Sequence, residues 1–99
     1  MIRRVIFETL AKEDFFGAMR WYGESQPGLE WKFLIEVHAA VKLLEENPSI
    51  GKTFEGPMRR FLINRFPYWL YYQVLGDVLL IVGCVDCRRE QSLIFERIQ

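Results

Sequence analysis

The fold is decided by residues 59–85, which read RRFLINRFPYWLYYQVLGDVLLIVGCV. Aromatic and β-branched side chains dominate this segment, which predicts three strands, over Arg59–Arg65, Trp69–Leu75 and Val78–Val85. Gly76-Asp77 joins the last two as a two-residue hairpin turn, with glycine where a positive φ is needed. We therefore expect consecutive antiparallel strands here.

The strand over Trp69–Leu75 carries large side chains on both faces. Successive residues of a strand point to opposite sides. A sheet with helices on one side only should alternate apolar with polar residues. The second face is therefore predicted to be covered by the C-terminal tail, by a second copy of the chain or by a separate protein. The two faces carry Leu70, Tyr72 and Val74 on one side and Trp69, Tyr71 and Leu75 on the other.

Upstream of these strands, the sequence predicts a short strand over residues 2–7 and then two amphipathic helices. Thr9 is a suitable N-cap for the first helix, and Gly23 followed by Pro27-Gly28 ends it. The second helix ends at Asn47-Pro48, because the residue before proline is pushed out of helical geometry. The apolar stripes comprise Ala11, Phe15, Ala18, Met19 and Tyr22 in the first helix and Leu29, Phe33, Val37, Ala40, Val41 and Leu44 in the second.

The short connection between the helices predicts an antiparallel helical hairpin. Residues 48–58 hold two prolines and two glycines and are expected to form a loop, and residues 92–98 a final strand or short helix. The order β-α-α-β-β-β, with helices grouped and then strands grouped, predicts a single α+β domain over residues 1–99. In it the hairpin packs on one face of a mainly antiparallel sheet.

Composition points to a partner. Hydrophobic residues make up 51% of the 99 residues and aromatic ones 15%, which is more than so small a core can hide. The net charge is zero, which gives no general attraction to nucleic acid or membrane. Basic residues gather locally, in Arg59-Arg60 with Arg65 and in Arg88-Arg89. These clusters form either a positive surface or the solvated ends of strands.

No apolar run resembles a signal peptide or a membrane span, so we expect a cytoplasmic protein without membrane association. Cys84 and Cys87 form a C-x-x-C pattern but do not provide a disulfide framework. Positions three apart on a strand point to opposite faces, and the pattern lacks the further cysteine or histidine that a zinc site needs. We expect Cys84 to be a buried small hydrophobe, and no metal or cofactor.

The ordered set Arg59-Arg60-Phe61-Leu62, Arg65-Phe66-Pro67-Tyr68 and Tyr72, followed by the Gly76-Asp77 turn, resembles the ParE branch of the ParE/RelE toxin superfamily. The likeness extends over nearly the whole chain. The further residues that carry it are Ala11, Asp14, Trp21, Tyr22, Asn47, Pro48, Gly51, Arg88, Arg89 and Arg97.

The resemblance implies a toxin that is neutralised by a cognate antitoxin, whose C-terminal segment docks as a helix in an apolar groove and as a strand at a sheet edge. Members of the ParE type inhibit DNA gyrase, and members of the RelE type cut messenger RNA on the ribosome. The cutting branch has an arginine where this chain has Trp69 and a tyrosine where it has Phe95, and only Arg89 is kept. We therefore favour gyrase inhibition by binding, without catalytic residues or sequence-specific nucleic-acid recognition.

The alternatives are an RNA endonuclease that uses Arg89 and Arg65, and an inactive family member that only binds an antitoxin. Asp86 and Ile94 depart from the ParE pattern, which often has histidine and tryptophan there. A homodimer in the absence of antitoxin is a further expectation. The predicted target-binding residues are Arg88, Arg89, Phe95 and Arg97, and the predicted antitoxin-binding residues are Trp21, Tyr22, Trp31, Trp69 and Tyr71.

Overall fold

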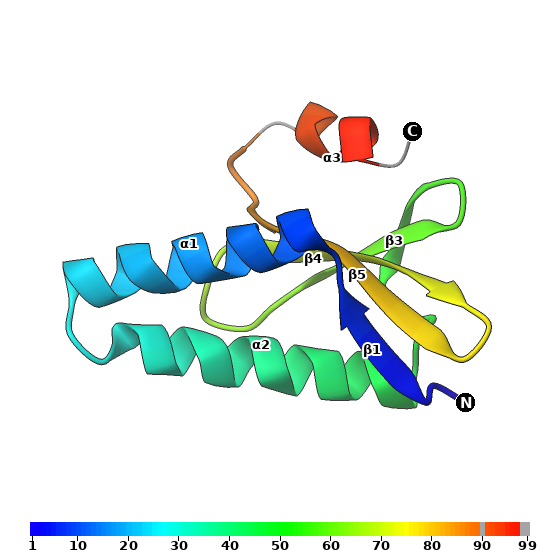
Figure 1. The fold of residues 1–99 in the computed structure, drawn as a ribbon, viewed down its shortest axis with the longest axis horizontal. Helices are drawn as coiled ribbons and strands as arrows, with labels where there is room; N and C mark the ends of the chain where they lie inside the picture. Colours follow the sequence, from blue (N-terminus) through cyan, green and yellow to red (C-terminus); the bar gives the residue numbers. More distant parts are fainter. Residues whose placement is uncertain (90, 98–99) are drawn as a thin grey trace.

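A computed structural model describes residues 1–89 and 91–97 (Figure 1). It confirms the α+β class and the helical hairpin. The elements are β1 (Arg4–Phe7), α1 (Thr9–Ser25), α2 (Leu29–Glu46), β2 (Lys52–Glu55), β3 (Met58–Leu62), β4 (Tyr68–Leu75), β5 (Val78–Asp86) and α3 (Ser92–Arg97). Within the described residues, no helix combines the length and the apolar character that crossing a bilayer requires.

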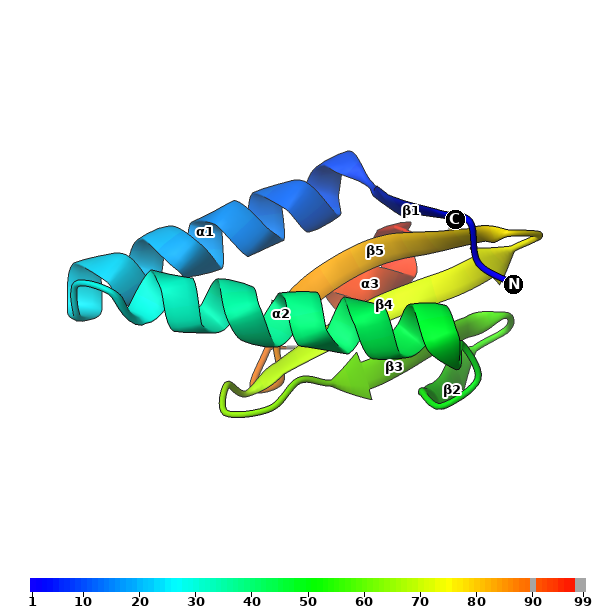
Figure 2. The same cartoon turned by 90° about the horizontal axis from the view of Figure 1, so that it is seen from below.

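The strands form one sheet in the order β1-β5-β4-β3-β2. β1 runs parallel to β5, and the other neighbouring pairs are antiparallel, which confirms the prediction of a mainly antiparallel sheet. The hairpin of α1 and α2 lies on one side of the sheet and α3 on the other (Figures 1 and 2). We call these two sides the hairpin face and the tail face.

The main core lies between the hairpin and the sheet. Ala11, Phe33 and Leu44 contribute fully buried side chains from the helices, and Leu70 and Tyr72 do so from β4. These are the positions that the helical and strand periodicities assign to the core. The aromatic rings of Tyr22, Phe33, Phe66 and Tyr68 meet edge to face at its end, where such contacts add to the burial of their area.

A bulge in β5 changes the alternation of side chains along the strand. Tyr71 pairs with Gly83, whereas its neighbour Tyr72 pairs with Ile81, so that Val82 is the extra residue. As a result Ile81 and Cys84 both belong to the core of the hairpin face, which a regular strand would not allow. Cys84 is buried, as predicted, and Cys87 is exposed beyond the end of the strand; both thiols are free.

The C-terminal tail covers part of the tail face, which is one of the three coverings that the sequence left open. It is a short helix, and the part of the prediction that concerns residue 98 falls outside the described residues. Ile94 is completely buried and packs with Tyr71 and Val85 in a second, smaller cluster. The chain itself therefore buries Leu70, Tyr71 and Tyr72 in the middle of β4 on both faces, whereas Val74 and Leu75 near its end stay exposed.

Several predicted boundaries were wrong. Residues 48–58 are not entirely loop, because β2 forms there and pairs with β3 across a bulge. Thr9 is not the N-cap: the helix begins at Thr9, and Glu8 precedes it without a capping hydrogen bond from its side chain. The first helix continues past Gly23 to Ser25. The strand predicted over Arg59–Arg65 ends at Leu62, since Arg65 adopts a left-handed conformation, with φ 69°.

Candidate partner-binding site

An apolar groove with a volume of about 610 Å³ lies between the hairpin and β1. β1 is an edge strand, so its outer side carries backbone groups that no other strand pairs. We call this hollow the β1 groove. It is lined by Val5, Ile6, Phe7, Lys12, Phe15, Phe16, Leu34, Val37, His38 and Val41.

Exposed apolar side chains continue from the groove over the outside of the hairpin. Phe16 is 57% exposed, Trp31 60% and Ile35 62%. A helix that is apolar around most of its circumference is normally covered on all sides. Among the described residues, no element covers the outer side of α2, where Trp31 and Ile35 are exposed.

The predicted antitoxin-binding residues separate into two groups. Trp21 and Trp31 are exposed on the hairpin, whereas Tyr22 and Tyr71 are buried, with exposures of 8% and 2%. Tyr22 packs in the core and Tyr71 beneath α3, so both support a surface and do not form one. Trp69 lies on the tail face, where it packs against the cluster of Tyr71, Val85 and Ile94.

A second hollow of about 320 Å³ lies between α1 and the end of β5. We call it the Arg89 cleft. It brings Trp21 together with Arg89, two residues for which the sequence predicted different partners. Its lining consists of Glu13, Asp14, Gly17, Ala18, Trp21, Tyr68, Cys84, Asp86 and Arg89.

Arg88 and Arg89 differ in what holds them. Arg88 donates from Nε and from its backbone N–H to Asp86 Oδ1, both at 2.9 Å. These bonds favour the charged carboxylate and hold the pKa of Asp86 below its ordinary value. Arg89, by contrast, has no hydrogen-bond or ion-pair partner for its side chain among the described residues. Its guanidinium is the available cation of the cleft.

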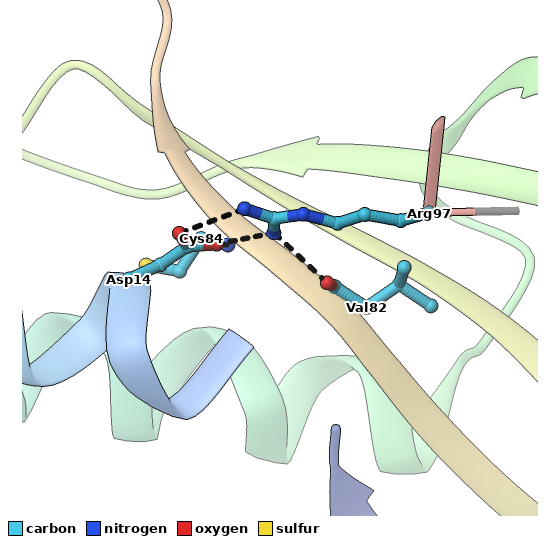
Figure 3. A network of polar contacts seen from close by, with 4 residues as sticks. All are labelled: Asp14, Val82, Cys84 and Arg97. Carbon is cyan, nitrogen blue, oxygen red and sulfur yellow. Dashed lines mark hydrogen bonds and ion pairs between the residues drawn. The ribbon is translucent and has the colours of Figure 1, made fainter. Parts of the chain in front are cut away.

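Arg97 does not project toward solvent as its predicted target-binding role requires. It donates to both carboxylate oxygens of Asp14, at 2.6 and 3.0 Å, and to the carbonyl of Val82 at 3.2 Å (Figure 3). Asp14 also accepts the backbone N–H of Cys84 at 3.0 Å. Arg97 therefore ties α3 to α1 across β5. Phe95, on the same helix, keeps 37% of its surface exposed.

The tail face holds an aromatic cluster that brings Phe95, a predicted target-binding residue, together with Tyr71 and Trp69, which were predicted to bind antitoxin, and with Phe54, which was not predicted. Phe54 stacks on Phe95 with ring centres 5.1 Å apart and meets Tyr71 edge to face. The guanidinium of Arg60 lies 4.1 Å from the Trp69 ring centre. The strand register could have placed Arg60 in this cluster. Arg60 lies opposite Tyr71, and Leu62, two residues further along β3, lies opposite Trp69 of β4. The position of Phe54 could not be read in this way, because it depends on the bulge in β2.

Arg65 forms an ion pair with Glu36, with Nε and Oε2 3.3 Å apart, and its side chain is 71% exposed. His38 lines the β1 groove, whereas Arg89 lines the other hollow, so the histidine is not placed to exchange protons at Arg89.

Burial raises the pKa of Tyr68 above its ordinary range, which keeps the hydroxyl at the Arg89 cleft protonated. In the described part of the chain, no three side chains of the metal-binding types come together. This arrangement can bind an acidic surface through Arg89.

Comparisons with known proteins agree with the fold. Residues 5–92 match the family model described as "ParE toxin of type II toxin-antitoxin system, parDE". A chain in the solved structure of the chromosomal ParDE TA system from P. aeruginosa superposes with a TM-score of 0.75 at 19% identity. The match covers 87% of this chain and 96% of that one. No curated protein matches the sequence.

Proposed function

Because the chain belongs to the ParE toxin family of type II toxin–antitoxin systems, we propose that a cognate antitoxin neutralises it through the β1 groove and that its target is DNA gyrase. Its action is binding, in the cytoplasm, without chemistry of its own. The observation that carries the antitoxin site is the apolar lining of the groove next to the unpaired edge of β1.

The groove suits two docking modes at once. An amphipathic helix of the antitoxin can bury its apolar side against Phe16 and Leu34, and an extended segment can add to the free edge of β1. Both docking modes cover apolar surface that is otherwise costly to expose to water.

The same exposed apolar surface supports self-association of the chain when antitoxin is absent. Light scattering of the free chain tests this, and a monomer at high concentration contradicts it.

Two neighbouring positions of α2 provide a matched test of the groove. Leu34 lines the groove and is 36% exposed, whereas Ile35 does not line it and is 62% exposed. We expect Leu34→Glu to weaken antitoxin binding about tenfold or more, because it places a charge under an apolar partner. Ile35→Glu has the same charge and a similar change in size, and it should retain most of the affinity. Equal losses in titration calorimetry would argue against the groove.

The gyrase proposal rests on the family and on the Arg89 cleft. Arg89 has no side-chain partner among the described residues and lines the same cleft as Trp21, and arginine and tryptophan are both frequent at binding hot spots. A supercoiling assay with purified gyrase tests the proposal. We expect inhibition by the wild-type chain and a loss of about tenfold in potency for Arg89→Ala. Normal supercoiling at a large excess of the chain contradicts gyrase as the target.

A second assay separates the alternatives. Primer extension on translated messages detects an RNA endonuclease, and cleavage sites that disappear with Arg89→Ala would assign that activity to this chain. A chain that binds antitoxin tightly but affects neither gyrase nor messages would be an inactive member of the family.

A further inference from the structure

Arg60 on β3 is a partly buried arginine without a polar partner among the described residues. Its guanidinium carbon lies 4.1 Å from the ring centre of Trp69 and 5.6 Å from that of Phe54. Its Nε is shielded from solvent and has no hydrogen-bond acceptor among the described residues. The aromatic rings therefore hold the cation in place, and the described residues leave the Nε donor unused.

The other arginines with comparable packing are satisfied within the chain. Arg59, its neighbour on β3, donates to the carbonyls of Ser49 and Gly51 and secures the loop before β2. Arg97 donates three hydrogen bonds, two to Asp14 and one to Val82. An outside acceptor cannot reach the shielded Nε, but the terminal Nη groups of a guanidinium that is fixed in one orientation are suited to receive one.

The surroundings indicate the chemical class of this acceptor. Base stacking, the usual way to hold single-stranded nucleic acid, needs an open ring face. Here Arg60 covers one face of Trp69, and Phe54 stacks on Phe95 at an interplanar angle of 29°. What the surface offers instead is the donor group of Arg60, which matches a carboxylate.

The rim of this surface suits a protein partner. Leu62 is 47% exposed and Phe95 37%, which gives apolar contact area around the charged group. Lys52 is the cross-strand partner of Arg60 and adds a second positive charge. Arginine is enriched among the hot-spot residues near the centre of protein interfaces, where apolar contacts exclude water around them.

We propose that Arg60, held by Trp69 and Phe54, receives an aspartate or glutamate of an acidic, partly apolar segment of the toxin's target protein. This inference rests on the proposed function in one respect, namely that the chain acts by binding a protein target. The tail face lies on the opposite side of the sheet from the hairpin that lines the β1 groove. An antitoxin segment in that groove does not compete directly for Arg60.

Titration of the full chain with two short probes tests the proposal. The probes are a hexaglutamate peptide and a uridine hexanucleotide, and the readout is the Nε–Hε resonance of Arg60, which the Trp69 ring displaces from its ordinary position. We expect the peptide to shift this resonance saturably and the nucleotide to have little effect. Arg60→Gln should weaken peptide binding by about tenfold, as expected when a charged donor is removed.

Arg65→Gln is the matched control, because it removes an exposed arginine that Glu36 already neutralises. It should change peptide affinity less than about twofold. A shift caused by the nucleotide alone, or by neither probe, overturns the proposal. If Arg60→Gln does not fold, the wild-type titration still decides, and Arg60→Lys, which keeps the charge but not the planar group, gives the second comparison.

Supercoiling assays keep this inference separate from the proposed function. If the wild-type chain leaves supercoiling unchanged, gyrase is not the target, and the peptide titration still judges Arg60. If the wild-type chain inhibits gyrase and Arg60→Gln inhibits it equally, the function stands and the role of Arg60 in target binding is refuted.

Discussion

Asp14 in α1 and Arg97 in α3 form a two-pronged ion pair between residues that lie near opposite ends of the sequence (Figure 3). Their side chains are only 12% and 15% exposed. The same carboxylate accepts the backbone N–H of Cys84 beside the bulge in β5. One aspartate therefore joins the first helix, strand β5 and the tail helix.

Breaking this pair should destabilise the protein more than breaking a surface pair. We expect Asp14→Asn or Arg97→Gln to lower the free energy of unfolding by about 2 kcal/mol, because each leaves its partner desolvated and unpaired. Urea denaturation measures the change. The double variant should lose less than the sum of the two single losses, since the interaction can be lost only once.

The control is the exposed pair of Arg65 and Glu36. Arg65→Gln should cost less than about 1 kcal/mol, because solvent already screens this pair. Additive losses for Asp14→Asn and Arg97→Gln would show that the two residues act independently.

Gly83 is the position that allows α3 to approach the sheet. A Cβ there would lie 2.6 Å from Cδ1 of Ile94 and 3.0 Å from Nη1 of Arg97. Ile94 is completely buried, so it has little room to yield. We expect Gly83→Ala to cost about 1–3 kcal/mol through overpacking and to displace α3. Hydrogen exchange should then accelerate in residues 92–97 more than in the hairpin.

Gly17 provides the comparison for a glycine without this constraint, because an added Cβ meets nothing within 4 Å. It lies inside α1, where Gly→Ala should stabilise by up to about 1 kcal/mol. Unchanged exchange in α3 of Gly83→Ala would mean that the tail does not depend on this close approach.

Tyr72 holds the loop between α2 and β2 through its hydroxyl. The hydroxyl donates to the carbonyl of Pro48 at 2.7 Å and accepts the N–H of Gly51 at 3.0 Å. Tyr72→Phe keeps the buried ring but leaves both backbone groups without this partner. We expect a loss of about 1–3 kcal/mol in thermal or chemical unfolding. Tyr71→Phe is the control, and a similar loss there would contradict the specific role of Tyr72.

The sequence predicted the parts of the fold that follow from periodicity. Phe33 and Leu44 recur at helical spacing and Leu70 and Tyr72 at strand spacing, and all four are in the core. The two-sided pattern of β4 also predicted a covering for the tail face. These predictions succeed because local periodicity determines which side of an element can be buried.

What could not be predicted depends on contacts between distant segments. The bulge in β5 puts Ile81 and Cys84 on one face, and its position is fixed by the pairing with β4. Arginine is a common binding residue, so the sequence predicted Arg97 to contact the target. Its ion pair with Asp14 forms only when α3 packs against the sheet. Arg60 is the opposite case, a candidate binding residue that the sequence did not predict. Only the strand register, which puts its side chain over Trp69, distinguishes it from Arg59.

The two cysteines should differ sharply in reactivity. Burial raises the pKa of the Cys84 thiol far above its ordinary value, and the nearby Asp14 carboxylate adds to this effect. Cys87 is exposed beyond the end of β5. Since the thiolate is the reactive form, Ellman's reagent at pH 8 should label one thiol in the native chain and two in urea. Cys87→Ser should abolish the native reaction, and rapid labelling of two native thiols would contradict the buried position of Cys84.

The same shift makes the protein less stable in alkali. Burial raises the pKa of Cys84 above its ordinary 9.0 and that of Tyr72 above its ordinary 10.0. Above pH 9 the unfolded chain therefore loses protons that the folded chain keeps, so the free energy of unfolding falls as pH rises. The contribution is fully present below pH 9. Urea midpoints at pH 8 and pH 10.5 measure the fall, and Cys84→Ala should reduce it. An unchanged slope in that variant would assign the alkaline loss to the tyrosines.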